Sequence, residues 1–326
     1  MVHRALGSSE LKESTDWLKD PVEPGVRAQA LIQLEGRPLN DPEVKAAQKT
    51  SLHRGSIAKM LDGLNSEPCS VEGLFEPKYA APYYRLVALA DMGAPSDQLI
   101  QTVLDSVLKV LPKPEGGFGK LEGHICITGN IVRAATHFGR GDDPRVRRGV
   151  EWLLAQQRHD GGWNCFPEDD PNGTVDSWEP LAALGEIPIT QRSPEMRRAI
   201  ERGTEFFLEQ RLGVEAGYEP WTRIHFPRHY YYDFLLGLEL VTSLGDPHDP
   251  RLKPALELLL SKASADGRWA LDLTHPDVDP EGDPPYKPIW AKFLATVVRL
   301  EVEPPGTPSR WASVAAMRVL QRTGSL

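Results

Sequence analysis

A unit of about fifty residues recurs along the chain, and this repeat limits its possible folds more than any other feature. Each copy pairs a turn and a helix-capping residue, often followed by Pro, with an amphipathic run. An Asp, Asn or Ser cap followed by Pro starts a helix, because the cap accepts free amide protons and Pro in the first turn loses no hydrogen bond. The pattern predicts that each copy opens a helix. The copies begin at Asn40, Ala94, Asp142, Arg192 and His248.

More apolar helical runs alternate with these copies. Several of them end at Gly, the usual helix stop. Strict alternation of a polar-faced helix with an apolar one predicts an all-α fold, an (α/α)6 toroid of inner and outer helices that forms a single domain over residues 1–326. An open solenoid and separate helical bundles are the alternatives. The apolar runs are VRAQALIQLEG, YYRLVALADMG, ITGNIVRAATHFG, WEPLAALGEI, YYDFLLGLELVTSLG and IWAKFLATVVRLEV.

Composition excludes some classes of partner. The net charge is −9 and no sustained Lys/Arg cluster occurs, which argues against nucleic acid as a ligand. No stretch approaches the roughly 18 apolar residues of a membrane span, and the opening residues lack an apolar signal region. We therefore expect a cytoplasmic protein without a transmembrane segment. Its oligomeric state is left open.

One segment, residues 147–165, carries a specific resemblance. Its sequence RRGVEWLLAQQRHDGGWNC is similar to the QW motif of squalene and oxidosqualene cyclases, with Gln156 or Gln157 and Trp163 at the motif positions. In that family the Gln caps a neighbouring helix and the Trp stacks near it. The resemblance implies a toroid and a structural role for Trp163. PEGGFGK and ADGRWAL are weaker copies of the same pattern.

Class II terpene cyclases of this superfamily protonate an alkene with the central Asp of a D-x-D-D motif. The nearest string here is DVDP, residues 277–280, which lacks the last Asp and lies in a Pro-rich stretch typical of a solvated turn. We therefore expect no class II cyclase activity.

The chain also resembles the protein prenyltransferase β subunit, a single toroid with a catalytic zinc. In that family a D-x-C pair opens one inner helix and a His opens the next. GTVDSWEPLAAL and RHYYYDFLLGLEL are similar to these starts, which places Asp176 and His229 at the zinc positions. Trp178 stands where the family has Cys, and acidic FPEDDPNG replaces its basic diphosphate-binding residues. These departures speak against prenyl diphosphate chemistry.

A candidate metal site follows from the expected geometry. If the inner helices are parallel, their N-termini open at one end of the ring and their polar residues converge there. Cys126, Cys165, Asp176 and His229 then form a candidate Zn2+ site, since thiolate, carboxylate and imidazole are the usual zinc ligands. The positive helix ends are also expected to lower the pKa of a thiol. Three cysteines suit free thiols or ligands better than a disulfide framework, and buried inert thiols are the alternative.

Candidate acid–base residues lie at the same helix starts. Asp176 and Glu179 open one inner helix, and Asp233 opens the next with either Tyr231 or His229 as its partner. An ordinary capped helix start is the alternative for this second group. One further catalytic candidate, for which a structural histidine is the alternative, is His275.

These observations favour an enzyme that transforms a hydrophobic, isoprenoid-like small molecule in the central cavity, with zinc as a candidate cofactor. Two alternatives stay open. The first is a metal-dependent hydrolase or lyase on the same fold. The second is a non-catalytic binding or scaffold protein, because a fold does not determine a function.

Overall fold

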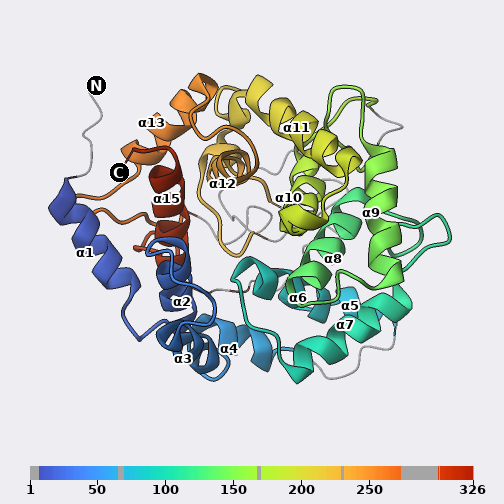
Figure 1. The fold of residues 1–326 in the computed structure, drawn as a ribbon, viewed down its shortest axis with the longest axis horizontal. Coiled ribbons are helices and arrows are strands. Elements are labelled where there is room, and N and C mark those ends of the chain that lie inside the picture. The colour runs from blue at the N-terminus through green and yellow to red at the C-terminus, as the bar shows by residue number, and fades with distance from the viewer. Residues whose placement is uncertain are drawn as a thin grey trace.

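The structure is a computed structural model that describes residues 7–64, 70–166, 170–228, 231–272, 300 and 302–325. Helices form a ring, with inner and outer helices alternating along the chain (Figure 1). The outer helices are α1 (Ser8–Leu18), α3 (Pro42–Ser51), α7 (Gln98–Val110), α9 (Pro144–Gln156), α11 (Pro194–Glu209) and α13 (Lys253–Ser261). The inner helices are α2 (Pro24–Gln33), α6 (Pro82–Asp91), α8 (Ile125–His137), α10 (Trp178–Glu186), α12 (Phe234–Leu244) and α15 (Arg310–Arg322).

Shorter helices connect these elements. Helix α4 (Gly55–Asp62) bridges α2 and α6, and α5 (Val71–Phe75) packs against α6. The 3-10 helices are η1 (Val175–Ser177), η2 (Ile189–Gln191), η3 (Arg211–Gly213), η4 (Glu219–Thr222) and η5 (Pro250–Leu252).

Contacts between neighbouring helices close the ring. They run from α2 through α4, α6, α8, α10 and α12 to α15, and α15 in turn contacts α2. This last contact distinguishes a closed ring from an open solenoid. The predicted (α/α)6 toroid is confirmed.

Two expected elements differ in the structure. The run that begins at Asn40 was expected to form one helix but forms two, α3 and α4. The break falls at Gly55, whose φ of 81° lies in the left-handed region that favours Gly. The Glu23 carboxylate then caps α4 by accepting from the Ser56 hydroxyl at 2.8 Å and from its backbone N–H at 3.1 Å. The last expected inner run, residues 289–302, lies almost wholly outside the described residues.

A recurring turn connects three of the outer helices, α7, α9 and α13, to the inner helix that follows. In each of three copies a Gly with positive φ precedes a fully buried aromatic residue. The backbone N–H of that aromatic residue donates to a hydroxyl at or near the start of an inner helix. The weaker sequence copies, PEGGFGK and ADGRWAL, therefore share the geometry of the QW-like segment. The three pairs are Phe118 with Thr128 at 2.9 Å, Trp163 with Ser177 at 2.7 Å, and Trp269 with Ser313 at 3.0 Å.

The two tryptophans of these turns also donate hydrogen bonds to the outer helix that precedes them in the chain. The indole N–H of Trp163 donates to the Leu153 carbonyl at 2.7 Å, and that of Trp269 donates to the Leu259 carbonyl at 2.8 Å. The Gln157 side chain donates to the Ala199 carbonyl of α11 at 2.9 Å. Each such turn therefore joins consecutive helices through hydrogen bonds as well as packing.

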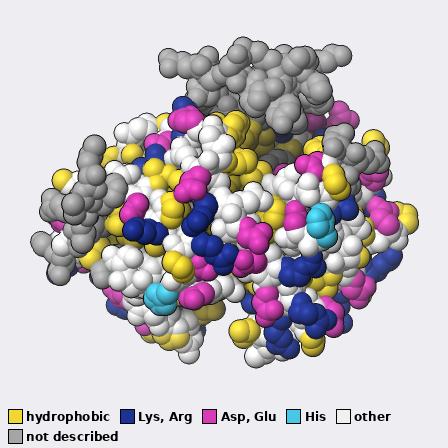
Figure 2. Space-filling view, turned by 90° about the horizontal axis from the view of Figure 1, so that it is seen from above, with side chains coloured by type: hydrophobic (Ala, Val, Ile, Leu, Met, Phe, Trp, Pro, Cys, Tyr) yellow, Lys and Arg dark blue, Asp and Glu magenta, His cyan; other side chains and the backbone are white. Residues whose placement is uncertain are grey.

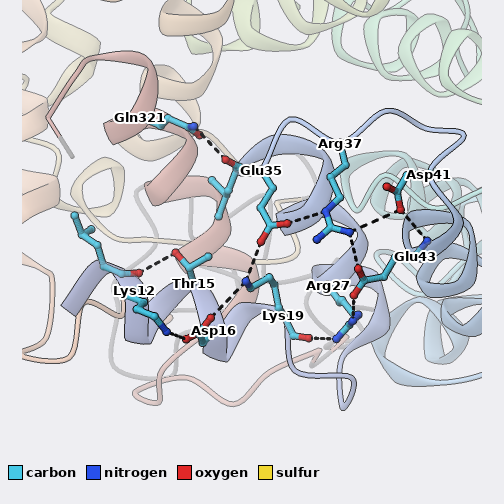
Figure 3. Close-up of polar contacts among 12 residues, drawn as sticks. Lys12, Thr15, Asp16, Lys19, Arg27, Glu35, Arg37, Asp41, Glu43 and Gln321 are labelled. Atoms are coloured by element: carbon cyan, nitrogen blue, oxygen red, sulfur yellow. Dashed lines mark hydrogen bonds and ion pairs between the residues drawn. The ribbon is translucent and has the colours of Figure 1, made fainter. Parts of the chain in front are cut away.

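The ring closes at a seam between α1, α2 and α15. On its surface, Lys19 and Arg37 both pair with Glu35 at 2.8 Å, and Gln321 of α15 donates to the Leu34 carbonyl at 3.2 Å (Figure 3). Exposed pairs of this kind contribute little each. In the buried part of the seam, the Trp311 indole N–H donates to the Ser56 hydroxyl at 2.9 Å.

Replacing Trp311 by Phe is expected to lower the free energy of unfolding by about 1 kcal/mol, because the seam loses one buried hydrogen bond but keeps an aromatic ring. Urea unfolding followed by circular dichroism measures the change. A Trp17→Phe variant on the outer side of the seam is the control, since the Trp17 indole N–H forms no hydrogen bond within the described part of the chain. Equal losses in the two variants would contradict the role given to the Trp311 bond.

Among the described helices, none combines the length and the apolar character needed to cross a membrane. On the face seen in Figure 2, Lys and Arg side chains lie beside Asp and Glu, with no large patch of one sign.

Candidate active site in the ring interior

A cavity of about 200 Å³ lies among the inner helices, toward their C-terminal ends. The spacing of its lining residues identifies which helix faces turn inward. On α12 they recur at the three- and four-residue spacing of one helix face, and on α15 they are Arg318 and Arg322. The lining residues are Ala90, Asp91, Arg133, Ala182, Gly185, Glu186, Arg228, Leu236, Glu239, Leu240, Ser243, Leu244, Arg318 and Arg322.

The inward faces of α8 and α10 extend from this cavity to the N-terminal end of the ring. On α8, Cys126 lies seven residues before the cavity-lining Arg133, which returns it to the same face. On α10, Glu179 lies three residues before the cavity-lining Ala182. Cys126 and Glu179 at these helix starts therefore lie on the same helix faces as the cavity-lining residues Arg133 and Ala182.

A cluster of two thiols and two carboxyl groups forms at this N-terminal end. The Cys126 backbone N–H donates to the Cys165 sulfur at 3.4 Å, and the Cys165 N–H donates to an Asp176 oxygen at 3.4 Å. Cys165 follows the recurring turn at Trp163, and Asp176 lies in η1 at the entry to α10. The turn and the helix start thus bring together three residues that the sequence predicted to meet.

Glu179 is the most perturbed carboxyl group of this cluster. Its side chain is almost fully buried, and neither carboxyl oxygen has a hydrogen-bond partner within the described residues. Burial raises the pKa of Glu179 well above its usual range, the negative charge of Asp176 raises it further, and Arg133 opposes the shift. Burial and the charge of Asp176 therefore favour the protonated form of Glu179.

The expectation of a lowered thiol pKa is wrong. The hydrogen bond from Cys165 acts to lower the pKa of Cys126, but burial and the nearby Glu179 and Asp176 outweigh it and raise that pKa. The bond to Cys126 and burial raise the pKa of Cys165 well above its usual range. Adjacent acidic groups and desolvation thus exceed the effect of the helix ends, and both thiols stay neutral.

The zinc site stays a prediction. Three of its expected ligands, Cys126, Cys165 and Asp176, lie in the cluster just described, while His229 falls outside the described residues. Within the part of the chain that the structure describes, no three His, Cys, Asp or Glu side chains are placed so that they could hold a metal ion.

Asp233 has a different partner from those expected. One of its oxygens caps α12 by accepting from the Leu236 N–H at 2.8 Å. The other accepts from the His225 backbone N–H at 2.9 Å and lies 3.4 Å from the His225 ring nitrogen Nδ1. Burial acts to raise the pKa of Asp233, but His225 and Arg228 outweigh burial and hold the pKa below its usual range.

Sequence reasoning missed the contact of Asp233 with His225 because the two residues meet across an irregular loop. The predicted pairs of Asp233 with Tyr231 or His229 stay predictions, and His229 lies outside the described residues. The Tyr231 ring centre lies 6.0 Å from that of His225. The candidate His275 is outside the described residues.

Sequence reasoning also missed the arginines of the cavity. Arg133 stands within the apolar run ITGNIVRAATH, and Arg318 and Arg322 stand one turn apart on α15. An arginine on an otherwise apolar inner helix was the available signal, because a charged side chain there must face either a partner or a cavity.

These features define the protein as an α/α toroid with a polar ring interior. No protein-family model matches the chain, and no curated protein matches it. Among solved structures it is similar to type II terpene cyclase MstE from Scytonema. For a variant in complex with geranylgeranyl dihydroxybenzoate the identity is 13%, with 86% of this chain and 98% of that chain covered, at a TM-score of 0.36. For the apo enzyme the identity is 14%, with 86% of this chain and 99% of that chain covered, at a TM-score of 0.33.

A protein from Actinoplanes is also similar, at 17% identity over 85% of this chain and 99% of that chain, with a TM-score of 0.36. At these scores the backbones superpose only loosely. The assignment of the fold therefore depends on the helices and contacts described above.

Proposed function

We propose that the protein is an enzyme that performs general acid–base catalysis on a hydrophobic, isoprenoid-like small molecule in the ring interior. Glu179 is the proton donor in this proposal, and Asp176 is the base. The main supporting observation is that Glu179 is buried beside Asp176 with a raised pKa, on a helix face that continues into the cavity. A strongly perturbed titratable group beside a second carboxyl group is typical of a catalytic site.

The two carboxyl groups differ in their surroundings in a way that supports different roles. Glu179 is buried and keeps its proton, whereas Asp176 is only half-buried and lies in η1, nearer the end of the ring. The negative charge of Asp176 helps to keep the proton on Glu179. A proton can then leave Glu179 when a substrate atom gains negative charge, and Asp176, which lies beside Glu179, can accept one.

The raised pKa of Glu179 also bears on the reaction type. A carboxyl group that holds its proton tightly is a weak acid, so it suits transfer to an oxygen atom better than to an alkene. We therefore propose that the substrate carries an alcohol, epoxide or carbonyl oxygen. This agrees with the expected lack of class II cyclase activity, and the isoprenoid-like class of the substrate rests on the sequence resemblance to the toroid families.

A panel of isoprenoid alcohols, isoprenoid epoxides and hydrocarbons of matched length tests this function. Incubation with purified protein, followed by gas chromatography and mass spectrometry, is expected to show conversion of oxygenated compounds only. Activity that is lost on treatment with a zinc chelator and restored by Zn2+ would instead favour the metal-dependent hydrolase or lyase. Binding of the compounds without any conversion would overturn the enzyme proposal in favour of a binding protein.

A further inference from the structure

The cavity at the C-terminal ends of the inner helices is lined by more cations than anions. Asp91 pairs with Arg133 at 2.5 Å. Glu239 pairs with both Arg228 and Arg318. The fourth arginine, Arg322, has no carboxylate partner within the described residues and donates to the Glu239 backbone carbonyl at 3.3 Å.

The third carboxylate of the cavity, Glu186, contacts a histidine. One of its oxygens lies 3.2 Å from Nδ1 of His137. Burial acts to lower the pKa of His137, but its contact with Glu186 outweighs burial and raises it. The lining residues alone, four arginines against three carboxylates, leave an excess of one positive charge, since arginine stays protonated in proteins.

The excess charge is concentrated on one side of the cavity. Burial lowers the pKa of Arg318, and the charges of Arg322 and Arg228 lower it further. These three arginines therefore repel one another across a partly desolvated space. The Glu239 carboxylate already pairs with Arg228 and Arg318, so a further negative charge beside Arg322 and Arg318 would relieve the repulsion that is left.

Unused hydrogen-bond donors point to the same conclusion. The side chain of Arg133 is more than nine-tenths buried, and its Nε–H has no hydrogen-bond partner within the described residues. The Nε–H of Arg318 is likewise buried without such a partner. Buried donors of this kind are rare unless a ligand or water completes them. The cavity volume of about 200 Å³ is several times the roughly 30 Å³ of one water, so an ion of several atoms fits.

We infer that this cavity is a binding site for a small oxyanion, a carboxylate or phosphate group, held by Arg318, Arg322 and Arg133. The planar guanidinium group binds the paired oxygens of carboxylates and phosphates in a bidentate manner. The site lies toward the other end of the inner helices from the Glu179 cluster, and Arg133, which also acts on the pKa of Glu179, connects the two. The binding test does not depend on the function proposed for that cluster.

Thermal unfolding titrated with sodium phosphate or sodium acetate, at constant ionic strength set with sodium chloride, tests the inference. The unfolding midpoint of the unmodified protein is expected to rise and to saturate with at least one of the two anions. Saturation with phosphate alone identifies a phosphate site, and saturation with acetate alone identifies a carboxylate site. The absence of a saturable rise with either anion overturns the inference.

Two variants separate the cavity from the surface. Arg322→Gln is expected to raise the half-saturating anion concentration at least tenfold. Arg147→Gln is the matched control, because Arg147 is an exposed residue paired with Asp142 at 2.6 Å, and it is expected to leave that concentration unchanged. Equal anion responses in the two variants would place the binding elsewhere and overturn the site.

The unfolding midpoint of Arg322→Gln without added anion provides a second measurement. A midpoint equal to or above that of the unmodified protein is expected, because the change removes one uncompensated charge. A large fall in the midpoint would mean that Arg322 serves only to neutralise carbonyl groups at the helix ends, and this would also overturn the inference.

Discussion

A Glu179→Gln variant is expected to lose at least about 100-fold in turnover on the oxygenated isoprenoid panel, because the amide cannot deliver the proton that the carboxyl group supplies. The amide has nearly the same shape, so the fold should be kept. Product formation under single-turnover conditions measures the loss. Glu151→Gln, on the exposed face of α9, is the control and should keep full activity.

The same variant is expected to be more stable than the unmodified protein at alkaline pH. The pKa of Glu179 is higher in the folded than in the unfolded state. Its contribution to the free energy of unfolding is therefore fully present below the unfolded pKa and is lost as the pH rises through the folded pKa. Gln has no such loss. Unfolding midpoints of the two proteins, measured from pH 4 to pH 9, should diverge as the pH rises above about 4.3, the usual pKa of an unfolded Glu, and the difference should stop growing above the folded pKa.

Reduced turnover together with this pH-dependent gain in stability separates a catalytic carboxyl group from a structural one. A Glu179→Gln protein that is as active as the Glu151→Gln control would contradict the catalytic role. Identical stability profiles for the variant and the unmodified protein would contradict the protonated state of Glu179.

Trp163→Ala is expected to lower the free energy of unfolding by about 3–5 kcal/mol, because loss of a fully buried indole leaves a large cavity and removes its hydrogen bond to the Leu153 carbonyl of α9. Thermal unfolding should show a fall of several degrees or more. Trp269→Ala, at the corresponding turn, should have a loss of similar size.

A Trp163→Phe variant divides this effect into its parts. It keeps most of the buried aromatic surface but loses the bond to the Leu153 carbonyl, so a loss of about 1–3 kcal/mol is expected. An unchanged melting temperature in Trp163→Ala would contradict the structural role of the recurring turn.

The ring of helices could be predicted because the residues that start and end each helix lie close to it in the sequence. Capping residues such as Asp143 and Ser193 accept backbone N–H groups at the helix starts where the sequence placed them. The closing helix α15 was not predicted, since its cap Ser309 is followed by Arg310 and not by Pro, and no Gly-aromatic turn directly precedes it in the sequence. The seam that it forms is a contact between distant parts of the chain, which periodicity does not encode.

The candidate site was predictable only in part. The meeting of Cys126, Cys165 and Asp176 follows from helix starts that share one end of the ring. The protonation states did not follow, because they depend on how deeply each group is buried and on which charges surround it. The same reason explains why the partner of Asp233 and the arginines of the cavity were missed: both depend on side chains that converge from several helices.

The contact between α15 and α2 has a consequence for how this chain acquires its native state. Residues near the two ends of the sequence, such as Ser14 and Met317, lie against each other, so the interior is enclosed only when the last helix docks. A growing polypeptide that has not yet produced residue 310 forms an arc whose inner faces are open to solvent. Contacts so far apart in sequence form slowly, and exposed apolar faces favour association. Before α15 docks, the exposed inner faces can bind a chaperone or associate with a second chain. Both processes would compete with folding at this step.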